Sequence, residues 1–88
     1  MPHYADTWTL KEIDRSRGDP KGTAFRAFKR LKAGFIEGHD FFYLSASEDA
    51  ESIEQLRDSG RIYAATINAL LFPEASYQAI VKQLDTAS

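Results

Sequence analysis

The chain has 88 residues, a formal net charge of −2 and 43% hydrophobic residues. This length suits a single domain, residues 1–88, and the composition excludes an intrinsically disordered chain. The absence of cysteine excludes disulfides and thiolate metal sites, and it is typical of the reducing cytoplasm.

No segment predicts export or membrane insertion. The start of the chain, Met-Pro-His-Tyr-Ala-Asp, lacks the basic and apolar regions of a secretory signal. The longest apolar run, Ala69–Pro73, is far shorter than a membrane span. We therefore expect a cytoplasmic protein without a membrane partner.

A capping box, Thr9 with Glu12, predicts a first helix at Leu10–Arg17. In this motif the side chain of each residue accepts a hydrogen bond from the backbone of the other. Trp8 and Ile13 stand beside it at the positions of a hydrophobic staple.

Residues 18–22, Gly-Asp-Pro-Lys-Gly, predict a turn before a second helix. Two starts are open for that helix. Asp19 caps it with Pro20 in the first turn, or Thr23 caps a helix that begins at Ala24. The helix then separates its residues into two faces. The apolar face holds Ala24, Ala27, Phe28 and Leu31, with Phe25 on its flank, and the opposite face holds Arg26, Lys29 and Arg30.

Positive charge is concentrated in these two helices. Seven bases and one acid stand between Arg15 and Lys32, a formal charge of +6 in a chain of −2. A face that only serves solvation usually mixes both signs, whereas the charges of the second helix are all positive. The pattern favours a polyanionic partner, and double-stranded DNA is the first candidate.

Residues 41–44 form a short aromatic run that predicts a strand. Phe42 and Leu44 would face one side of it, and Phe41 and Tyr43 the other. This alternation is more typical of residues that fill a core than of a base-stacking surface.

The next segments predict a surface helix and a hairpin. A second capping box, Ser45 with Glu48, opens a helix that ends at about Ser59. Residues 61–67 and 70–72 read as two strands joined by a tight turn.

The closing helix has Pro73 in its first turn and extends to about Leu84. Its apolar stripe consists of Tyr77, Ile80, Val81 and Leu84. The stripe could complete the monomer core or form a dimer face, and the sequence slightly favours the core. A helix-turn-helix reads only a few base pairs, so we expect a weak homodimer that DNA stabilises.

The order of elements predicts an α+β fold, a small helix-turn-helix domain with a short β-hairpin wing and a closing C-terminal helix. The second helix, at about residues 21–32, would enter the major groove. Arg26 and Arg30 would read bases, and residues at the helix ends would hold phosphates. The candidate DNA-binding residues are Arg15, Arg17, Lys21, Thr23, Arg26, Lys29, Arg30 and Lys32.

No pattern predicts an enzyme, a cofactor, a metal or a small-molecule substrate. His39 and Asp40 are the one pair that resembles an acid–base site. In a tight turn such a pair is far more often a surface hydrogen bond than a general base. Zinc-protease, P-loop and dinucleotide-binding motifs are absent from the sequence.

A second hypothesis places function in the acidic half of the chain. Residues 41–88 carry a net charge of −4. This half could bind a basic protein or mimic DNA, which would make the chain a protein-interaction module.

Three segments resemble the N-terminal DNA-binding domains of phage antirepressors of the KilA/Bro kind. Thr9–Ile13 resembles their opening T-x-K-E-I/L helix, and Phe35–Leu44 resembles F-x-E-G-x-D-F/Y-F-x-L. Leu70–Tyr77 is similar to L-L-T-E-x-G-Y, with Pro73 and Ala75 in place of the usual Thr and Gly. The resemblance covers most of the chain and implies phage-type DNA binding and transcription regulation.

Overall fold

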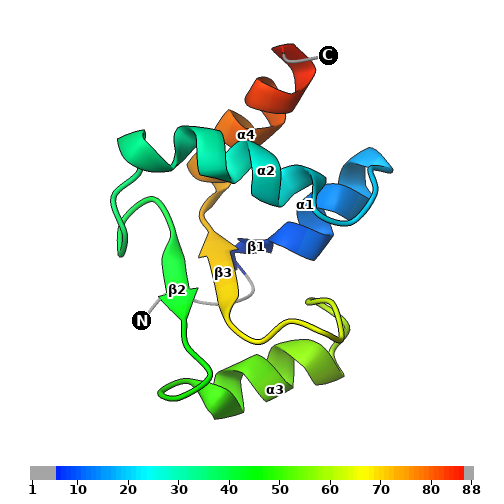
Figure 1. Ribbon diagram of the computed structural model, residues 1–88, viewed down its shortest axis with the longest axis vertical. Helices are drawn as coiled ribbons and strands as arrows, with labels where there is room; N and C mark the ends of the chain where they lie inside the picture. The colour runs from blue at the N-terminus through cyan, green and yellow to red at the C-terminus, as the bar shows by residue number, and fades with distance from the viewer. Residues whose placement is uncertain (1–5, 87–88) are drawn as a thin grey trace.

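The computed structural model describes residues 6–86, which form an α+β domain (Figure 1). The described part of the chain contains four α-helices and a three-stranded antiparallel sheet. In chain order the elements are β1 (Trp8–Thr9), α1 (Leu10–Arg17), α2 (Thr23–Leu31), a 3-10 turn (Lys32–Gly34), β2 (Phe42–Leu44), α3 (Ala50–Asp58), β3 (Ala69–Phe72) and α4 (Glu74–Thr86).

The central strand of the sheet is β3. It pairs antiparallel with β1 on one edge and with β2 on the other. Both of its faces are covered, because Leu70 and Phe72 pack in the core with α1, α2 and α4, and Ala69 and Leu71 pack in the core with α3. In Figure 1, α2 and α4 lie toward one end of the strands and α3 toward the other. Side chains alternate between the faces of a strand. A strand covered on both sides therefore needs the uninterrupted apolar sequence Ala-Leu-Leu-Phe.

Two hydrophobic cores follow from this layering. The first packs α1, α2 and α4 against one face of the sheet, and Phe72 of β3 is fully buried in it. Its buried members are Ile13, Ala24, Ala27, Phe28, Phe41, Phe72 and Ile80. The second packs α3 and the loop after it against the other face, through Leu44, Ile53, Leu56, Ile62, Ala69 and Leu71.

The predicted first helix is confirmed at both ends. The Thr9 hydroxyl accepts the Glu12 N–H at 3.1 Å, and the Glu12 carboxylate accepts the Thr9 N–H at 2.9 Å. Gly18 ends the helix with φ +69°, a left-handed conformation that glycine adopts at little cost.

The alternation predicted for residues 41–44 is also confirmed. Phe41 belongs to the first core, whereas Phe42 packs on the second and Leu44 is buried in it. Tyr43 pairs with Leu70 on the α2 side of the sheet and stays 47% exposed.

The predicted hairpin is wrong. Residues 61–67 form an irregular loop, and β3 begins at Ala69. The reason is that β1 and β2, which come from distant parts of the chain, occupy both edges of β3. Asn68 does not make the expected turn, since its side-chain oxygen accepts the Ala46 N–H at 2.9 Å.

The predicted start of the surface helix is also wrong. The Ser45 hydroxyl does accept the Glu48 N–H at 3.2 Å, but α3 begins only at Ala50. The Asp49 carboxylate accepts the Ser45 N–H at 3.0 Å, and the Asp49 N–H donates to the Ser45 carbonyl at 2.8 Å. These two bonds close residues 45–49 into a turn, and Asp49, whose φ of −123° and ψ of 29° are not helical, stands between this turn and α3 as the N-cap residue.

The closing helix begins at Glu74, one residue after Pro73, and completes the first core. Ile80 is fully buried, and the rest of its apolar stripe packs against the same core. Trp8 joins this helix to β1, because its indole ring stacks on Tyr77 with ring centroids 3.7 Å apart. The indole N–H also donates to the Glu74 carboxylate at 3.1 Å.

Replacing Trp8 with Ala should lower the free energy of unfolding by about 2 kcal/mol. This value lies between the cost of an aromatic pair, about 0.5–1.5 kcal/mol, and that of a fully buried tryptophan, about 3–5 kcal/mol. Urea denaturation measures it. Trp8→Phe keeps a ring on Tyr77 and should retain most of the stability, so equal losses in both variants would contradict the stacking account.

The Glu12 carboxylate should make the stability of the protein depend on pH in the acid range. Desolvation acts to raise its pKa, but hydrogen bonds from Arg61 and from the Thr9 N–H outweigh it and lower the pKa below the ordinary value. A lowered folded-state pKa stabilises the protein above the unfolded value, about 4.3. That stability is lost as pH falls further through the folded pKa.

Thermal unfolding from pH 7 to pH 3 tests this expectation. Glu12→Gln should flatten the fall in melting temperature below about pH 4.3, because its side chain has no proton to bind. Glu37→Gln, a change at an exposed glutamate, serves as control. A Glu12→Gln profile parallel to that of the parent would refute the assignment.

Candidate nucleic-acid interface

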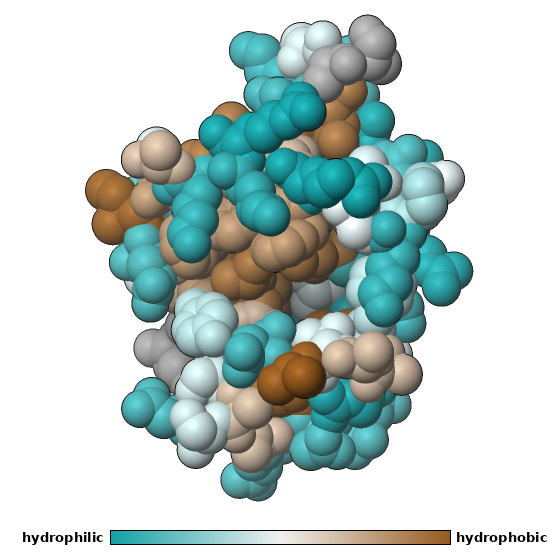
Figure 2. Space-filling view, in the orientation of Figure 1, coloured by the Kyte–Doolittle hydropathy of each residue, from teal (hydrophilic) through white to brown (hydrophobic). Residues whose placement is uncertain are grey.

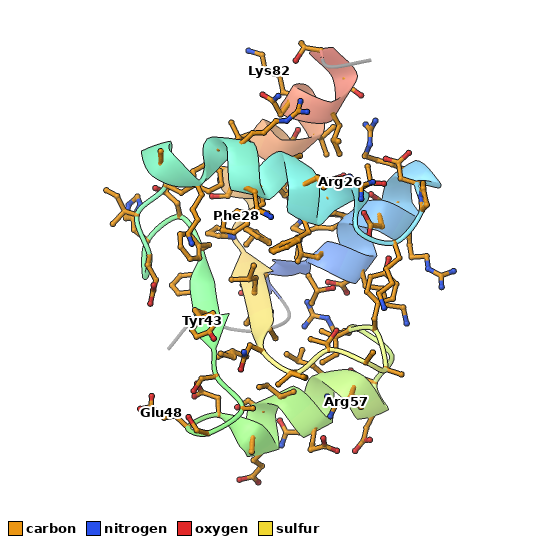
Figure 3. All side chains as sticks on the ribbon, in the orientation of Figure 1. Arg26, Phe28, Tyr43, Glu48, Arg57 and Lys82 are labelled. Carbon is orange, nitrogen blue, oxygen red and sulfur yellow. The ribbon has the colours of Figure 1, made fainter. Side chains whose placement is uncertain are left out.

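The two predicted faces of α2 are confirmed. Ala24, Ala27 and Phe28 are buried, whereas Arg26, Lys29 and Arg30 are exposed. Phe28 lies between the helix and the sheet (Figure 3), where its ring contacts Phe41 and Phe72 edge-on. These ring contacts fix the rotation of α2 about its axis, so the basic residues must face outward.

The positive charges of α2 have no acidic partners within residues 6–86. The five salt bridges there use Arg17, His39, Arg57 and Arg61 as their bases, and none uses a base of α2. Lys29 instead lies over the ring of Phe25, with its Nζ 5.3 Å from the ring centroid. Lys32, directly after the helix, is exposed as well. These four exposed residues, Arg26, Lys29, Arg30 and Lys32, form the basic surface of α2.

The start of α2 differs from both predictions. The helix begins at Thr23, and its N-cap residue is Gly22, which has no side chain to cap it. The cap comes from Asp14 of α1. The Asp14 carboxylate accepts the Ala24 N–H at 2.8 Å and the Gly22 N–H at 3.2 Å. It also accepts the Tyr63 hydroxyl at 2.7 Å.

This buried carboxylate has two consequences. Asp14 is only 1% exposed, so its oxygens are saturated by partners inside the protein. The N–H groups of Gly22, Thr23 and Ala24, which could otherwise bind an anion at the helix start, therefore already have acceptors inside the protein. Partial burial, together with the bond to Asp14, raises the pKa of Tyr63 to about 12, so the tyrosine stays a hydrogen-bond donor at neutral pH.

The other basic residues that were predicted to bind DNA differ in whether they form ion pairs inside the protein. Arg15 and Lys21 are exposed, and the Lys21 Nζ lies 5.1 Å from the centroid of the Tyr63 ring. Arg17 is balanced by two acids, with 2.8 Å to Asp19 and 2.6 Å to Asp85. It therefore ties α1 to the end of α4 rather than adding to the basic surface.

Thr23 is already engaged within the fold. Its hydroxyl donates to the Pro20 carbonyl at 2.8 Å. The hydroxyl proton that a phosphate contact would need thus stabilises the turn before α2.

The turn that contains His39 and Asp40 is held by backbone contacts. One oxygen of Asp40 accepts the Ile36 N–H at 2.8 Å, which lowers the pKa of this carboxyl below its usual range. The other oxygen lies 3.1 Å from Nδ1 of His39, whose side chain is 78% exposed. The Asp40 carboxylate therefore stabilises the turn through contacts with its own neighbours in the sequence.

The acidic charges gather on α3, at the opposite end of the molecule. Glu51, Glu54 and Asp58 are exposed and share one face at helical spacing. The sheet separates α3 from α2 (Figure 1). Helix α3 lies at one end of the 36 Å long axis, and the bases of α2 lie nearer the other end, where α4 stands beside α2 (Figure 1).

Sequence reasoning missed the role of Asp14 and Tyr63. One signal was present, because Asp14 follows Leu10 by about one turn and so lies on the apolar side of α1. An acid on a buried face needs hydrogen-bond donors. Tyr63 is 49 residues away in the sequence, and no local pattern links it to Asp14.

No known protein family, curated protein or solved structure matches this chain. Residues 6–86 contain no helix that is long and apolar enough to cross a membrane. The same residues contain no cluster of three His, Cys, Asp or Glu side chains that could hold a metal ion.

Proposed function

We propose that this protein binds double-stranded DNA through the basic surface of α2 and acts as a transcription regulator of the prophage type. The observation that carries the proposal is the outward row of Arg and Lys side chains that form no salt bridge with residues 6–86, on a helix whose inner face packs in the core. The regulatory role rests on the resemblance to KilA/Bro antirepressor domains. The α1–turn–α2 unit would serve as the helix-turn-helix of this reader.

The dimensions of α2 suit the major groove. Nine residues give a helix about 13.5 Å long, against a groove about 12 Å wide. Arg26 and Arg30 are four residues apart, so their side chains start about 6 Å apart along the axis. This separation is close to two base-pair steps, and arginine pairs with guanine through two hydrogen bonds.

Phosphate contacts fall to the lysines at the two ends of α2. Lys21 precedes the helix and Lys32 follows it, and both are exposed. The helix start itself holds Asp14, so a phosphate would gain little from its backbone N–H groups. Arg15 adds one exposed base from α1. Arg17 and Thr23 are left out of the proposed contacts because they already have partners inside the protein.

The charge separation of the molecule supports this orientation. An approaching duplex would attract the α2 end and repel the acidic face of α3, so electrostatic steering would favour encounters through α2. Because net charge alone would not attract DNA to a chain of −2, the local separation is essential to the proposal.

Fluorescence anisotropy with a generic duplex tests the proposal. We expect the logarithm of the affinity to fall linearly with the logarithm of salt concentration. Four to six neutralised phosphates would give a slope of about −4 to −5. The stoichiometry at saturation also shows whether one or two copies occupy the duplex, which tests the weak homodimer expected from the sequence. No binding at low salt would end the DNA proposal.

Two kinds of substitution separate base reading from charge. Arg26→Ala or Arg30→Ala should cost about 1–3 kcal/mol of binding and relax sequence preference. Arg26→Lys keeps the charge but loses the two-pronged contact. It should therefore keep the salt slope and lose enrichment of a preferred site from a random duplex pool. If both Ala variants bound like the parent, α2 would be the wrong helix.

The acidic face of α3 supports one alternative, an interaction module for a basic protein. Glu51, Glu54 and Asp58 are exposed on one face, and no apolar residue of α3 breaks it. Glu51→Gln with Asp58→Asn would abolish such binding and leave DNA binding intact or stronger. The same pair of substitutions therefore distinguishes the two functions.

A further inference from the structure

A cavity of about 270 Å³ opens below the start of α2, between α1 and the loop that precedes β3. Figure 2 shows it as part of a hollow with a brown floor on the front face, with teal side chains along its upper rim. Its apolar lining comes from three separate segments, through Leu10, Phe25, Ile62, Ile67 and Leu70.

Two lysines give the cavity a positive edge. The Nζ atoms of Lys11 and Lys21 lie 5.8 and 5.1 Å from the centroid of the Tyr63 ring, which also lines the cavity. Neither lysine forms an ion pair with residues 6–86. The acid in the lining, Asp14, has both oxygens bound inside the protein. A ligand would therefore meet an apolar floor and two available cations.

The volume of the cavity and the exposed apolar side chains at its rim indicate which kind of ligand fits it. Pockets for drug-sized molecules and cofactors measure about 300–1,000 Å³, so this one suits a single large side chain. Two apolar side chains also stand exposed at its mouth, Phe25 at 41% and Ile67 at 69%. A small molecule inside the cavity would leave this rim in water, whereas a polypeptide lying across it would cover both side chains.

We propose that this cavity docks an acidic segment of a partner protein, which inserts one large apolar side chain and places carboxylates beside Lys11 and Lys21. Interface hot spots have this form, an aromatic anchor in a pocket with a rim that excludes water. Charge complementarity excludes a basic segment, since both rim charges are positive.

The site shares Lys21 with the DNA contacts proposed above. A bound acidic segment would neutralise this lysine and place further negative charge beside the path of the duplex. The partner and DNA would then compete for the protein. Peptide binding itself does not depend on the DNA proposal, because either can be measured without the other.

Nuclear magnetic resonance titration of the full ¹⁵N-labelled chain tests the site. The probe is an acetylated and amidated peptide, Glu-Glu-Trp-Glu-Glu, at up to millimolar concentration. We expect saturable shifts of the backbone amides that line the cavity, Lys11, Lys21, Tyr63 and Ile67 among them. The peptide with Ala in place of Trp should lose the saturable shifts, and the peptide with Lys in place of Glu should not bind.

Matched substitutions test the apolar rim and the positive charge of the site separately. Ile67→Ser should weaken peptide binding about tenfold through lost apolar burial. Ile36→Ser, at a side chain that is similarly exposed at 65% and lies outside the cavity, should have no effect. Lys21→Gln should weaken binding up to about fivefold, and Lys82→Gln on α4 should not.

Three results would overturn the proposal. These are the absence of shifts at millimolar peptide, equal shifts with the peptide that lacks Trp, and equal affinities of the Ile67→Ser and Ile36→Ser variants. Shifts spread along α2 and independent of Trp would mean that the peptide binds the basic surface by charge alone. DNA binding that persists in any of these cases would leave the proposed function standing.

Discussion

The rest of the structure depends on the hydrogen bonds of the Asp14 carboxylate, which join three parts of the chain. This carboxylate extends from α1, caps the start of α2 and holds Tyr63 of the loop before β3. The second helix has no cap of its own, because Gly22 stands at the N-cap position with φ +96°. Unpaired N–H groups are costly inside a protein, so this one side chain secures the first turn of α2 against α1. With that end held, the ring contacts of Phe28 set the rotation of α2 and hence the direction of the basic surface.

The separation of the basic residues of α2 from the acidic residues of α3 is the basis of the DNA-binding proposal. The sheet keeps the bases of α2 away from the acids of α3, and both sets stay exposed. DNA would bind one end of the molecule, and the cavity below α2 lies beside that same end. Lys21 belongs to both proposed sites, which links the occupancy of one to that of the other. A protein built this way could release DNA when an acidic partner arrives, without any change in fold.

The sequence predicted the elements whose signals are local. The capping box at Thr9, the glycine at position 18 and the two faces of α2 are all properties of neighbouring residues, and all three are confirmed. The failures involve distant partners. The hairpin was wrong because β1 and β2 occupy both edges of β3. Likewise, exposure of most candidate bases could be predicted, but the pairing of Arg17 with Asp85, 68 residues away, could not.

The free energy of unfolding of the Asp14→Ala variant, measured by urea denaturation, tests the role of this carboxylate most directly. The substitution leaves the Gly22 and Ala24 amides and the Tyr63 hydroxyl without their acceptor. The buried Ala24 amide should cost about 1–3 kcal/mol, and the two half-buried groups about 1 kcal/mol each. We therefore predict a total loss of about 3–5 kcal/mol. Tyr63→Phe removes only one donor and should cost about 1 kcal/mol. An Asp14→Ala protein within about 0.5 kcal/mol of the parent, a value typical of surface substitutions, would contradict the account.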